Sequence, residues 1–188
     1  MIDIRVASPD DAAAFAAIYA PIVTATHVSF EEVAPTVDEM RARITKTLER
    51  TPWLAAVEDG KVIGYAYATR HRERPGYRWA VDVSVYLDRG ARGRGIGRTL
   101  YERLFAILER QQFRRAYAGI ALPNDASIAV HRALGFEPIG VYRRVGWKFD
   151  RWYDVAWFGR DIGDARGEQR PAEPIPFPRL SAPRSSPS

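Results

Sequence analysis

Apolar residues along this chain follow two different periods, and the alternation of these periods predicts a fold of mixed helices and strands. Four segments repeat apolar residues with the 3.6-residue period of an amphipathic helix, whereas seven are short apolar or alternating runs typical of strands. The predicted strands are 1–6, 53–57, 62–68, 79–87, 115–122, 136–145 and 149–158. The predicted helices follow Ser8, Thr36, a glycine-rich stretch at 90–97, and Asn124 or Asp125.

Local signals support the ends of several of these elements. Ser8 precedes a proline and two acids, and Thr36 forms a capping box with Glu39, so both positions are predicted helix starts. Residues 58–61 are typical of a hairpin turn between two strands. Because most neighbouring strands are joined as hairpins and few by crossovers, the order of elements predicts an α+β fold with a mixed sheet.

The composition of the chain changes after residue 163. Six of the thirteen prolines lie between Pro171 and Pro187, among serine, arginine and alanine. A segment of this kind buries too little apolar area to offset the entropy that is lost on ordering. We therefore expect one domain over 1–163, and a tail over 164–188 that is disordered or loosely packed on the body.

Composition excludes several classes of protein. The length of 188 residues suits one domain, and the absence of cysteine excludes disulfides, thiolate metal sites and a cysteine nucleophile. His27 and His71 lack an acid or cysteine partner at metal-ligand spacing, so we expect no metal. No apolar stretch is long enough to span a bilayer, and the first residues lack signal-peptide features. We therefore expect a cytoplasmic protein with no membrane partner.

The net charge of +5 makes nucleic-acid binding an alternative to consider. The excess comes from scattered arginines and from arginines around the glycine-rich stretch, and the chain has no block of five or more basic residues. It also has no zinc-finger or basic-zipper pattern. We therefore expect no nucleic-acid partner.

The glycine-rich stretch lies between a predicted strand and a predicted helix. It contains glycines at 90, 93, 95 and 97 and arginines at 89, 92, 94 and 98. Glycine lets the backbone approach a ligand closely, and free N–H groups at a helix start bind phosphate. The stretch lacks the lysine of a Walker loop and the Gly-x-Gly-x-x-Gly spacing of a dinucleotide loop. These features predict a cradle for another phosphate-bearing ligand.

The frame Arg92-x-x-Gly95-x-Gly97 resembles the acetyl-CoA signature of the GCN5-related N-acetyltransferase (GNAT) superfamily. The segment from Asn124 to Phe136 is similar to the helix and Leu-Gly-Phe turn of the same superfamily. The resemblance implies that the loop N–H groups hold the CoA pyrophosphate, and that the preceding strand and the asparagine contact the pantetheine arm. The implied acetyl-CoA contacts are Val85, Tyr86, Leu87, Arg92, Gly93, Arg94, Gly95, Ile96, Gly97, Arg98 and Asn124.

Residues 77–86, 122–131 and 146–155 narrow the resemblance, because they are similar to segments of phosphinothricin and methionine-sulfoximine acetyltransferases. This implies a GNAT-type fold, with a central, mostly antiparallel twisted sheet of about seven strands flanked by about four helices, and a homodimer. It also implies acetyl transfer from acetyl-CoA to the amino group of a small amino-acid analogue, by direct attack in a ternary complex. The alternatives are another small amine, a protein N-terminus, and a CoA-binding regulatory domain without turnover.

Asp82 is the candidate catalytic base. The two-residue alternation of a strand puts Asp82, Ser84 and Tyr86 on one face, and aspartate is depleted in strands. We expect Asp82 to act through a water molecule; the resembling family usually has glutamate here, which is longer by one methylene. His131 stands where many members of the superfamily carry a tyrosine acid, and it is the candidate to protonate the leaving thiolate. Tyr86 and Tyr142 are the alternative acids.

The basic loop before the strand of Asp82 is the candidate acceptor-binding segment. Arginine side chains suit carboxylate and phosphinate groups, so Arg72 and Arg74 are candidates to hold the anionic end of a small amino acid. We expect Phe30 to wall the pocket, and Lys148 to serve it from the same or a partner subunit. The expected acceptor-binding residues are Phe30, Arg72, Arg74, Tyr77, Asp82 and Lys148.

Overall fold

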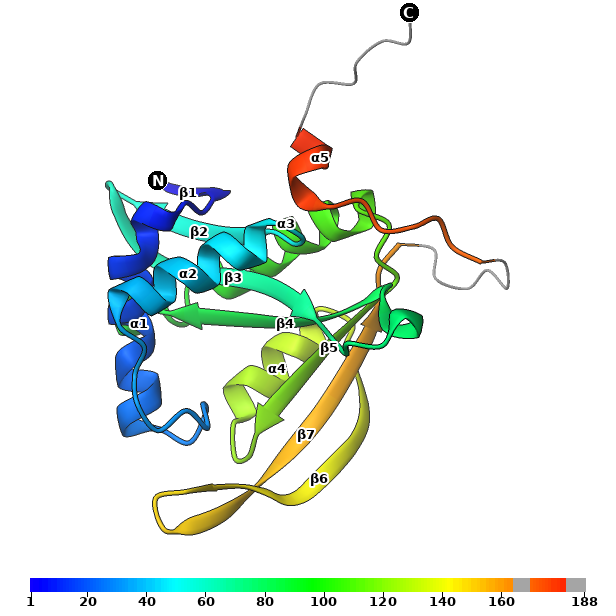
Figure 1. Cartoon of the computed structure of the whole chain (residues 1–188). Helices are drawn as coiled ribbons and strands as arrows, with labels where there is room; N and C mark the ends of the chain where they lie inside the picture. Colours follow the sequence, from blue (N-terminus) through cyan, green and yellow to red (C-terminus); the bar gives the residue numbers. More distant parts are fainter. Residues whose placement is uncertain (164–169, 182–188) are drawn as a thin grey trace, which may run out of the picture.

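The computed structural model describes residues 1–163 and 170–181, which form one seven-stranded sheet with helices on both faces (Figure 1). The strands lie in the order β1-β2-β3-β4-β5-β7-β6, and every neighbouring pair is antiparallel except β4 and β5. The strands are β1 (Ile2–Val6), β2 (Trp53–Glu58), β3 (Lys61–Arg70), β4 (Ala80–Leu87), β5 (Arg115–Ala121), β6 (Glu137–Lys148) and β7 (Arg151–Asp161). The predicted α+β fold with a mostly antiparallel sheet is confirmed.

The helices divide the apolar core between the two faces of the sheet. They are α1 (Ala12–Ala25), α2 (Val37–Leu48), α3 (Ile96–Arg110), α4 (Asp125–Ala133) and α5 (Phe177–Ser181). Helices α1 and α2 pack on one face, against Trp53, Ala55 and Tyr65. Helices α3 and α4 pack on the other face, with Val81 and Val83 beneath α3. No helix in the described ranges is long and apolar enough to cross a membrane.

Hydrogen bonds at the helix starts agree with two of the sequence signals. Thr36 Oγ1 accepts from the Glu39 N–H at 3.2 Å, and Glu39 Oε2 accepts from the Thr36 N–H at 2.7 Å, which completes the capping box of α2. The Oδ1 atom of Asn124 accepts from the Ser127 N–H at 3.1 Å and starts α4. After Ser8 the structure differs, because a short 3-10 turn comes first and α1 begins three residues later than its proline.

The sheet opens between β4 and β5. Strand β4 pairs with β3 from Val81 to Leu87, but it pairs with β5 only at Ala80, Val81 and Asp82. Beyond Asp82, in the described part of the chain, no strand pairs with the edge of β4 that faces β5. Backbone N–H and C=O groups on that edge therefore need another partner, and a ligand that enters the gap can supply it.

Residues 170–181 of the tail pack on the body of the protein. The Trp79 indole N–H donates to the Ala172 carbonyl at 2.8 Å. The backbone N–H of Ile175 donates to the Gln111 carbonyl at 2.8 Å, and the Gln111 side-chain amide donates to the Ile175 carbonyl at 2.7 Å. The segment thus provides partners for polar groups that the body would otherwise leave unpaired.

An aromatic anchor holds this segment on the body. Phe177 is 8% exposed, and its N–H donates to the Arg50 carbonyl at 3.1 Å. Prolines restrict the unfolded chain and so reduce the entropy that ordering costs. Composition alone did not reveal the contacts of Phe177. The expectation for 164–169 and 182–188 lies outside the described residues.

Candidate active site

The glycine-rich loop shapes the N-terminal end of α3. Gly93 and Gly95 have φ angles of +73° and +78°, in a region that residues with side chains rarely adopt. Gly95 is the N-cap residue of α3, and no side chain caps this helix end. The N–H groups in the first turn of α3 are therefore available to an anion, and the helix dipole favours negative charge there.

A cavity of about 290 Å³ opens beside this loop, between the free half of β4, the N-terminal part of α4 and the end of α1. Most of its wall is apolar, and its polar groups come from the glycine loop and α4, which suits a long ligand with an anionic end. Its lining residues are Ile22, Thr26, Val28, Val85, Tyr86, Leu87, Arg92, Gly93, Gly97, Asn124, Ala126, Ser127, Val130 and His131.

Most of the residues expected to bind acetyl-CoA gather in this cavity. They are Val85, Tyr86, Leu87, Arg92, Gly93, Gly97 and Asn124. Arg94 instead pairs with Glu58, with nitrogen–oxygen distances of 2.6 and 3.0 Å. Arg98 pairs with Glu102 one helical turn away, and Ile96 is 2% exposed and belongs to the core. The structure thus separates residues that line the cavity from residues that support the loop.

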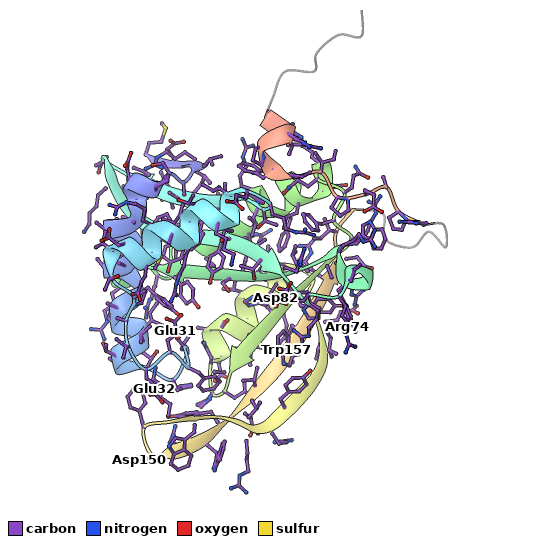
Figure 2. The ribbon with its side chains drawn as sticks, in the orientation of Figure 1. Glu31, Glu32, Arg74, Asp82, Asp150 and Trp157 are labelled. Carbon is purple, nitrogen blue, oxygen red and sulfur yellow. The ribbon has the colours of Figure 1, made fainter. Side chains whose placement is uncertain are left out.

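Asp82 lies where the sheet opens. It is the last residue of β4 that pairs with β5, opposite Tyr117, and it precedes the cavity residue Val85 by three positions. This spacing corresponds to about 10 Å along a strand. Figure 2 shows Asp82 and Trp157 in the region where β4, β5 and β7 come together. A ligand in this cavity would have to extend along β4 past Val85 to reach the Asp82 carboxylate.

The Asp82 carboxylate is hydrogen-bonded to His71, the residue that follows β3. The distance between His71 Nδ1 and Asp82 Oδ1 is 2.7 Å. Burial raises the pKa of the Asp82 carboxyl, while the hydrogen bond with His71 and the positive charge of Arg72 act in the opposite direction. A carboxylate with a raised pKa binds a proton more readily, which suits a group that acts as a base.

His71 was not identified from the sequence as a site residue. It belongs to no motif, and its spacing to other candidate ligands indicated only that it binds no metal. The available signal was the hairpin register, because Arg70 pairs with Val81 and Thr69 with Asp82. The residue after Arg70 must therefore lie close to the start of β4. The register of an antiparallel pair brings distant residues together without any sequence motif.

His131 lines the cavity beside the glycine-rich loop, which is called the donor cavity below after the acetyl-CoA that it is expected to bind. The His131 side chain is nevertheless buried, with 4% exposed. Its Nδ1 lies 2.7 Å from the Ser127 carbonyl oxygen, and therefore carries the proton, while Nε2 lies 3.2 Å from the Tyr101 hydroxyl. Burial lowers the pKa of His131, which favours the neutral imidazole. The two alternative acids, Tyr86 and Tyr142, lie in different environments. Burial raises the pKa of the Tyr86 hydroxyl well above its ordinary value, whereas the Tyr142 side chain is 51% exposed.

The two arginines expected to bind the acceptor face different surroundings. The Arg72 guanidinium lies 5.9 Å from the centre of the Trp157 ring, and its charge acts on Asp82. Arg74 lines a separate cavity together with Arg50, Arg70, Arg78 and Glu173, and Figure 2 draws it on the outer side of this region. The structure therefore brings Arg72, and not Arg74, to the Asp82 side of the loop.

Phe30 and Lys148 meet in a clamp between the α1–α2 connection and β6. A Cβ atom on Gly146 would lie only 2.3 Å from the Phe30 ring, so only glycine leaves room for this contact. Lys148 is 7% exposed, and its ammonium donates to the carbonyls of Val23, Ser29 and Glu31 at 2.5, 2.6 and 2.8 Å. All three donors of the ammonium are used within the chain, so Lys148 holds the connection that carries Phe30.

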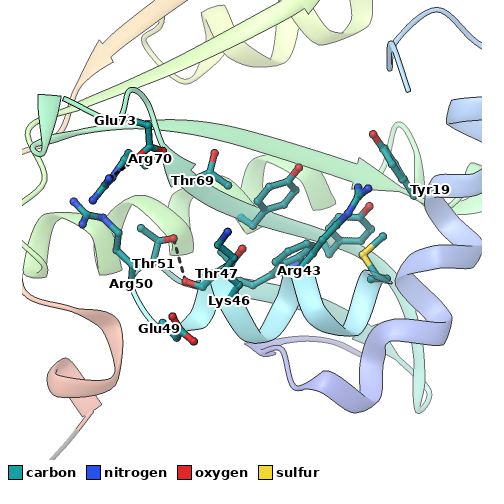
Figure 3. A pocket seen from close by; sticks show the side chains of 14 residues that line it. Tyr19, Arg43, Lys46, Thr47, Glu49, Arg50, Thr51, Thr69, Arg70 and Glu73 are labelled. Carbon is teal, nitrogen blue, oxygen red and sulfur yellow. Dashed lines mark hydrogen bonds and ion pairs between the residues drawn. The ribbon is translucent and has the colours of Figure 1, made fainter. Parts of the chain in front are cut away.

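A larger cavity of about 550 Å³ lies between α2 and β3 (Figure 3). Two of its cations are already paired, Arg43 with Glu31 at 2.8 Å and Arg70 with Glu73 at 2.7 Å. Neither Asp82 nor the glycine loop belongs to its lining. It is therefore distinct from the donor cavity. Within 1–163 and 170–181, no group of three or more histidine or acidic side chains could hold a metal ion.

A cavity that joins an anion cradle to the free edge of β4, with the Asp82 carboxylate further along the same strand, is compatible with acyl-group transfer. The sequence matches the family model of the acetyltransferase (GNAT) domain over residues 4–157. It is 44% identical over 161 residues to the phosphinothricin N-acetyltransferase of Alcaligenes faecalis, covering 85% of this chain and 82% of that protein. It is 35% identical to the L-methionine sulfoximine/L-methionine sulfone acetyltransferase of Salmonella typhimurium, covering 82% and 91%.

A solved structure gives the same result. The GNAT superfamily phosphinothricin acetyltransferase of Sinorhizobium meliloti, in complex with AcCoA, superposes with a TM-score of 0.88 at 36% identity, covering 94% of this chain and 96% of that one. The chain belongs to the GNAT acetyltransferase family, as the sequence resemblance indicated.

Proposed function

We propose that this protein transfers the acetyl group of acetyl-CoA to the amino group of a small anionic amino-acid analogue such as phosphinothricin or methionine sulfoximine. The observation that carries the proposal is the position of Asp82 on β4, three residues before the cavity residue Val85 and within the electrostatic influence of Arg72. The names and activities of the relatives support the same acceptor class.

On the donor side, the pyrophosphate is held by the first-turn N–H groups of α3 and by Arg92. The pantetheine arm lies along the free edge of β4, against Val85 and Leu87, and meets Asn124 from α4. A backbone N–H on that edge is available to stabilise negative charge on the thioester oxygen. This arrangement brings the thioester to the Asp82 region without any change in the fold.

On the acceptor side, the amine must lose a proton before it can attack, because an ammonium has no lone pair. The Asp82 carboxylate provides the negative charge that favours this proton transfer, and Arg72 attracts the anionic end of the acceptor. We infer that the acceptor is walled by Phe30 from the α1–α2 connection and by Trp157 from β7, whose ring centre lies 5.9 Å from the Arg72 guanidinium. When the C–S bond breaks, the CoA thiolate takes up a proton. His131 lines the donor cavity and is the candidate donor of this proton.

The test is thiol release from acetyl-CoA with a panel of acceptors: phosphinothricin, methionine sulfoximine, methionine sulfone, ordinary amino acids, polyamines and peptides. We expect the highest kcat/KM with one of the first three. Release only with polyamines or peptides would overturn the acceptor class and leave the acetyltransferase intact. Binding of acetyl-CoA without release for any acceptor would favour a regulatory domain.

We also propose a homodimer that associates through the β6–β7 hairpin. Seven of the fourteen large apolar side chains that are exposed in the described residues lie between Ile139 and Trp152. The rings of Trp147 and Trp152 stack edge to face at 5.2 Å while each is about half exposed. A concentrated apolar surface of this kind is typical of a subunit interface, and a second copy of the chain supplies the matching surface.

Sedimentation equilibrium tests the dimer. We expect a dimer for the wild type and a folded monomer for Trp147→Glu. Val6→Glu is the matched control, because Val6 is 44% exposed on β1, at the opposite edge of the sheet from β6. A wild-type monomer at assay concentration would refute this assembly.

The proposal includes a cytoplasmic location and no nucleic-acid partner. Acetyl-CoA is available inside cells, so the location is required by the donor. Cell fractionation tests the cytoplasmic location. Salt-dependent retention of DNA or RNA by the purified protein would contradict the absence of a nucleic-acid partner.

A further inference from the structure

The hydrogen bond between His71 and Asp82 defines which atom of the imidazole is free. An ionised carboxylate can only accept, so Nδ1 carries the proton and Nε2 keeps its lone pair. We propose that His71 Nε2 takes the proton from the acceptor amine, and that Asp82 acts by orienting His71 and by stabilising the imidazolium that forms. This inference rests on the proposed function and assigns its base to a residue outside the family motif.

Aromatic side chains from three elements hold the His71 ring in one orientation. The ring stacks on Tyr117 of β5 with a centroid distance of 4.4 Å and an interplanar angle of 26°. Trp157 of β7 meets its edge at 6.2 Å, and Tyr77 of the acceptor loop meets it at 6.1 Å. A base held in a fixed orientation loses little entropy when the substrate binds.

The exposure of the pair suits proton transfer from a bound ligand. The side chains of His71 and Asp82 are 13% and 29% exposed, so the pair is largely shielded from solvent but can be reached. Asp82 has a single methylene, which keeps its carboxylate close to β4. The imidazole extends the reach of the pair beyond the strand, over Tyr117 and toward the edge of Trp157.

The proton and electron balance is complete without an additional reactant. The N–H bond of the acceptor ammonium breaks as an N–H bond forms at His71 Nε2, and the amine lone pair then forms the C–N bond. The C–S bond breaks, and the sulfur leaves with the electron pair as a thiolate. The imidazolium gives this first proton to solvent and returns to neutral. The nitrogen that has formed the C–N bond must lose a second proton, which His71 Nε2 takes as the C–S bond breaks and which then goes to the thiolate. The products are therefore the amide, the CoA thiol and one proton in solvent.

Charges around the pair favour this direction of transfer. Asp82 is the anionic group in contact with His71, and it gains attraction when the ring becomes positive. Arg72 is the nearby cation, and its guanidinium is directed to Trp157. From the other packed elements, the titratable groups that face the ring are the hydroxyls of Tyr77 and Tyr117.

The test compares His71→Gln and His71→Ala with the wild type, using the best acceptor from the panel. We expect kcat to fall by about 100-fold, the contribution of a general base, with acetyl-CoA affinity unchanged. The pH dependence of kcat/KM should change in His71→Gln, and added imidazole should restore part of the activity of His71→Ala. Asp82→Asn is the matched control, in which imidazole should restore nothing. A His71→Gln enzyme with wild-type kcat and an unchanged pH profile would overturn the assignment.

Nitrogen-15 NMR of the histidines tests the inference without turnover, so its failure can be distinguished from failure of the proposed function. We expect His71 as the Nδ1–H tautomer in the wild type, and loss of that preference in Asp82→Asn. An Nε2–H tautomer in the wild type would overturn the proposal even in an active enzyme. Conversely, a protein that releases no thiol but shows the expected tautomer would refute the function and retain the pair.

Discussion

The proposed donor and acceptor halves of the site are built in different ways. The donor half is made mainly of backbone: the first turn of α3, two glycines with positive φ and the free edge of β4. The acceptor half is made of side chains from separate elements: His71 after β3, Asp82 on β4, Tyr117 on β5 and Trp157 on β7. The difference explains why the donor half has a short glycine signature, whereas the acceptor half is recognised only through longer resembling segments that leave His71 out.

Backbone recognition requires a local conformation, and glycine at given positions is the sequence record of that conformation. Side-chain recognition requires only that the fold brings suitable groups together, so the same chemistry can come from many positions. A family can therefore keep its donor while its acceptor changes. The predictions below ask whether the two halves can be altered separately.

Replacing Asp82 should have the largest effect and should act on the acceptor half alone. Asp82→Asn removes the charge that orients and stabilises the base, so we expect kcat to fall by about 100- to 10,000-fold. Calorimetric titration should give an unchanged Kd for acetyl-CoA. Asp38→Asn is the control, because the Asp38 side chain is 89% exposed on α2. A large loss of acetyl-CoA affinity in Asp82→Asn would mean that the two halves are not separable.

Lys148 tests how far the acceptor half depends on distant support. Lys148→Met leaves the carbonyls of Val23, Ser29 and Glu31 without their donor, which should reduce the free energy of unfolding by about 3 kcal/mol. Thermal unfolding should show a Tm lower by roughly 10 °C. We also expect a higher KM for the acceptor, because Phe30 loses its fixed position.

Lys61→Met is the matched control for this change. Lys61 is exposed at the start of β3, so the same substitution there should change stability by no more than about 0.5 kcal/mol. Equal Tm values for the two variants would refute the clamp. A higher acetyl-CoA Kd in Lys148→Met would place the clamp in the donor half.

The fold could be predicted from the sequence where the signals are local. The capping box at Thr36, the hairpin turn at 58–61 and the alternation along β4 each correspond to an observed feature, and the seven strands follow from them. The ordered part of the tail could not be predicted, because Phe177 finds its partners on residues far away in the chain. Composition reports the cost of ordering but not the contacts that offset it.

The site follows the same division. The sequence directed attention to Asp82, but not to His71, whose relation to Asp82 arises from the register of the β3–β4 hairpin. Arg72 and Arg74 look equivalent in the sequence, but the loop turns between them. Arg72 therefore lies over Trp157, whereas Arg74 lines a separate cavity. Adding the strand register to a motif search would have found His71.

Arg92 and Arg94 allow a paired test of the donor half. Arg92 lines the donor cavity, whereas Arg94 is occupied by Glu58. Arg92→Ala should weaken acetyl-CoA binding by roughly tenfold, the effect of losing one hydrogen bond to a charged group. Arg94→Ala should change it by less than about threefold, since an exposed ion pair contributes little. Equal effects in a titration at constant salt would show that the positive field of the loop matters more than individual contacts.

The smallest predicted effect concerns a single methyl group in the glycine loop. Gly95→Ala places a side chain at a φ angle of +78°, which should cost about 1 kcal/mol and raise the acetyl-CoA Kd by roughly fivefold as the start of α3 shifts. Gly90→Ala is the matched control, because Gly90 has no positive φ and an added Cβ would meet only the Asp88 carboxylate, at 3.6 Å. The acceptor KM should stay constant in both variants, since no acceptor group touches this loop. If Gly95→Ala instead raised the acceptor KM and left acetyl-CoA binding unchanged, the loop could not be the anion cradle, and the division between a backbone-built donor half and a side-chain-built acceptor half would fail at its first element.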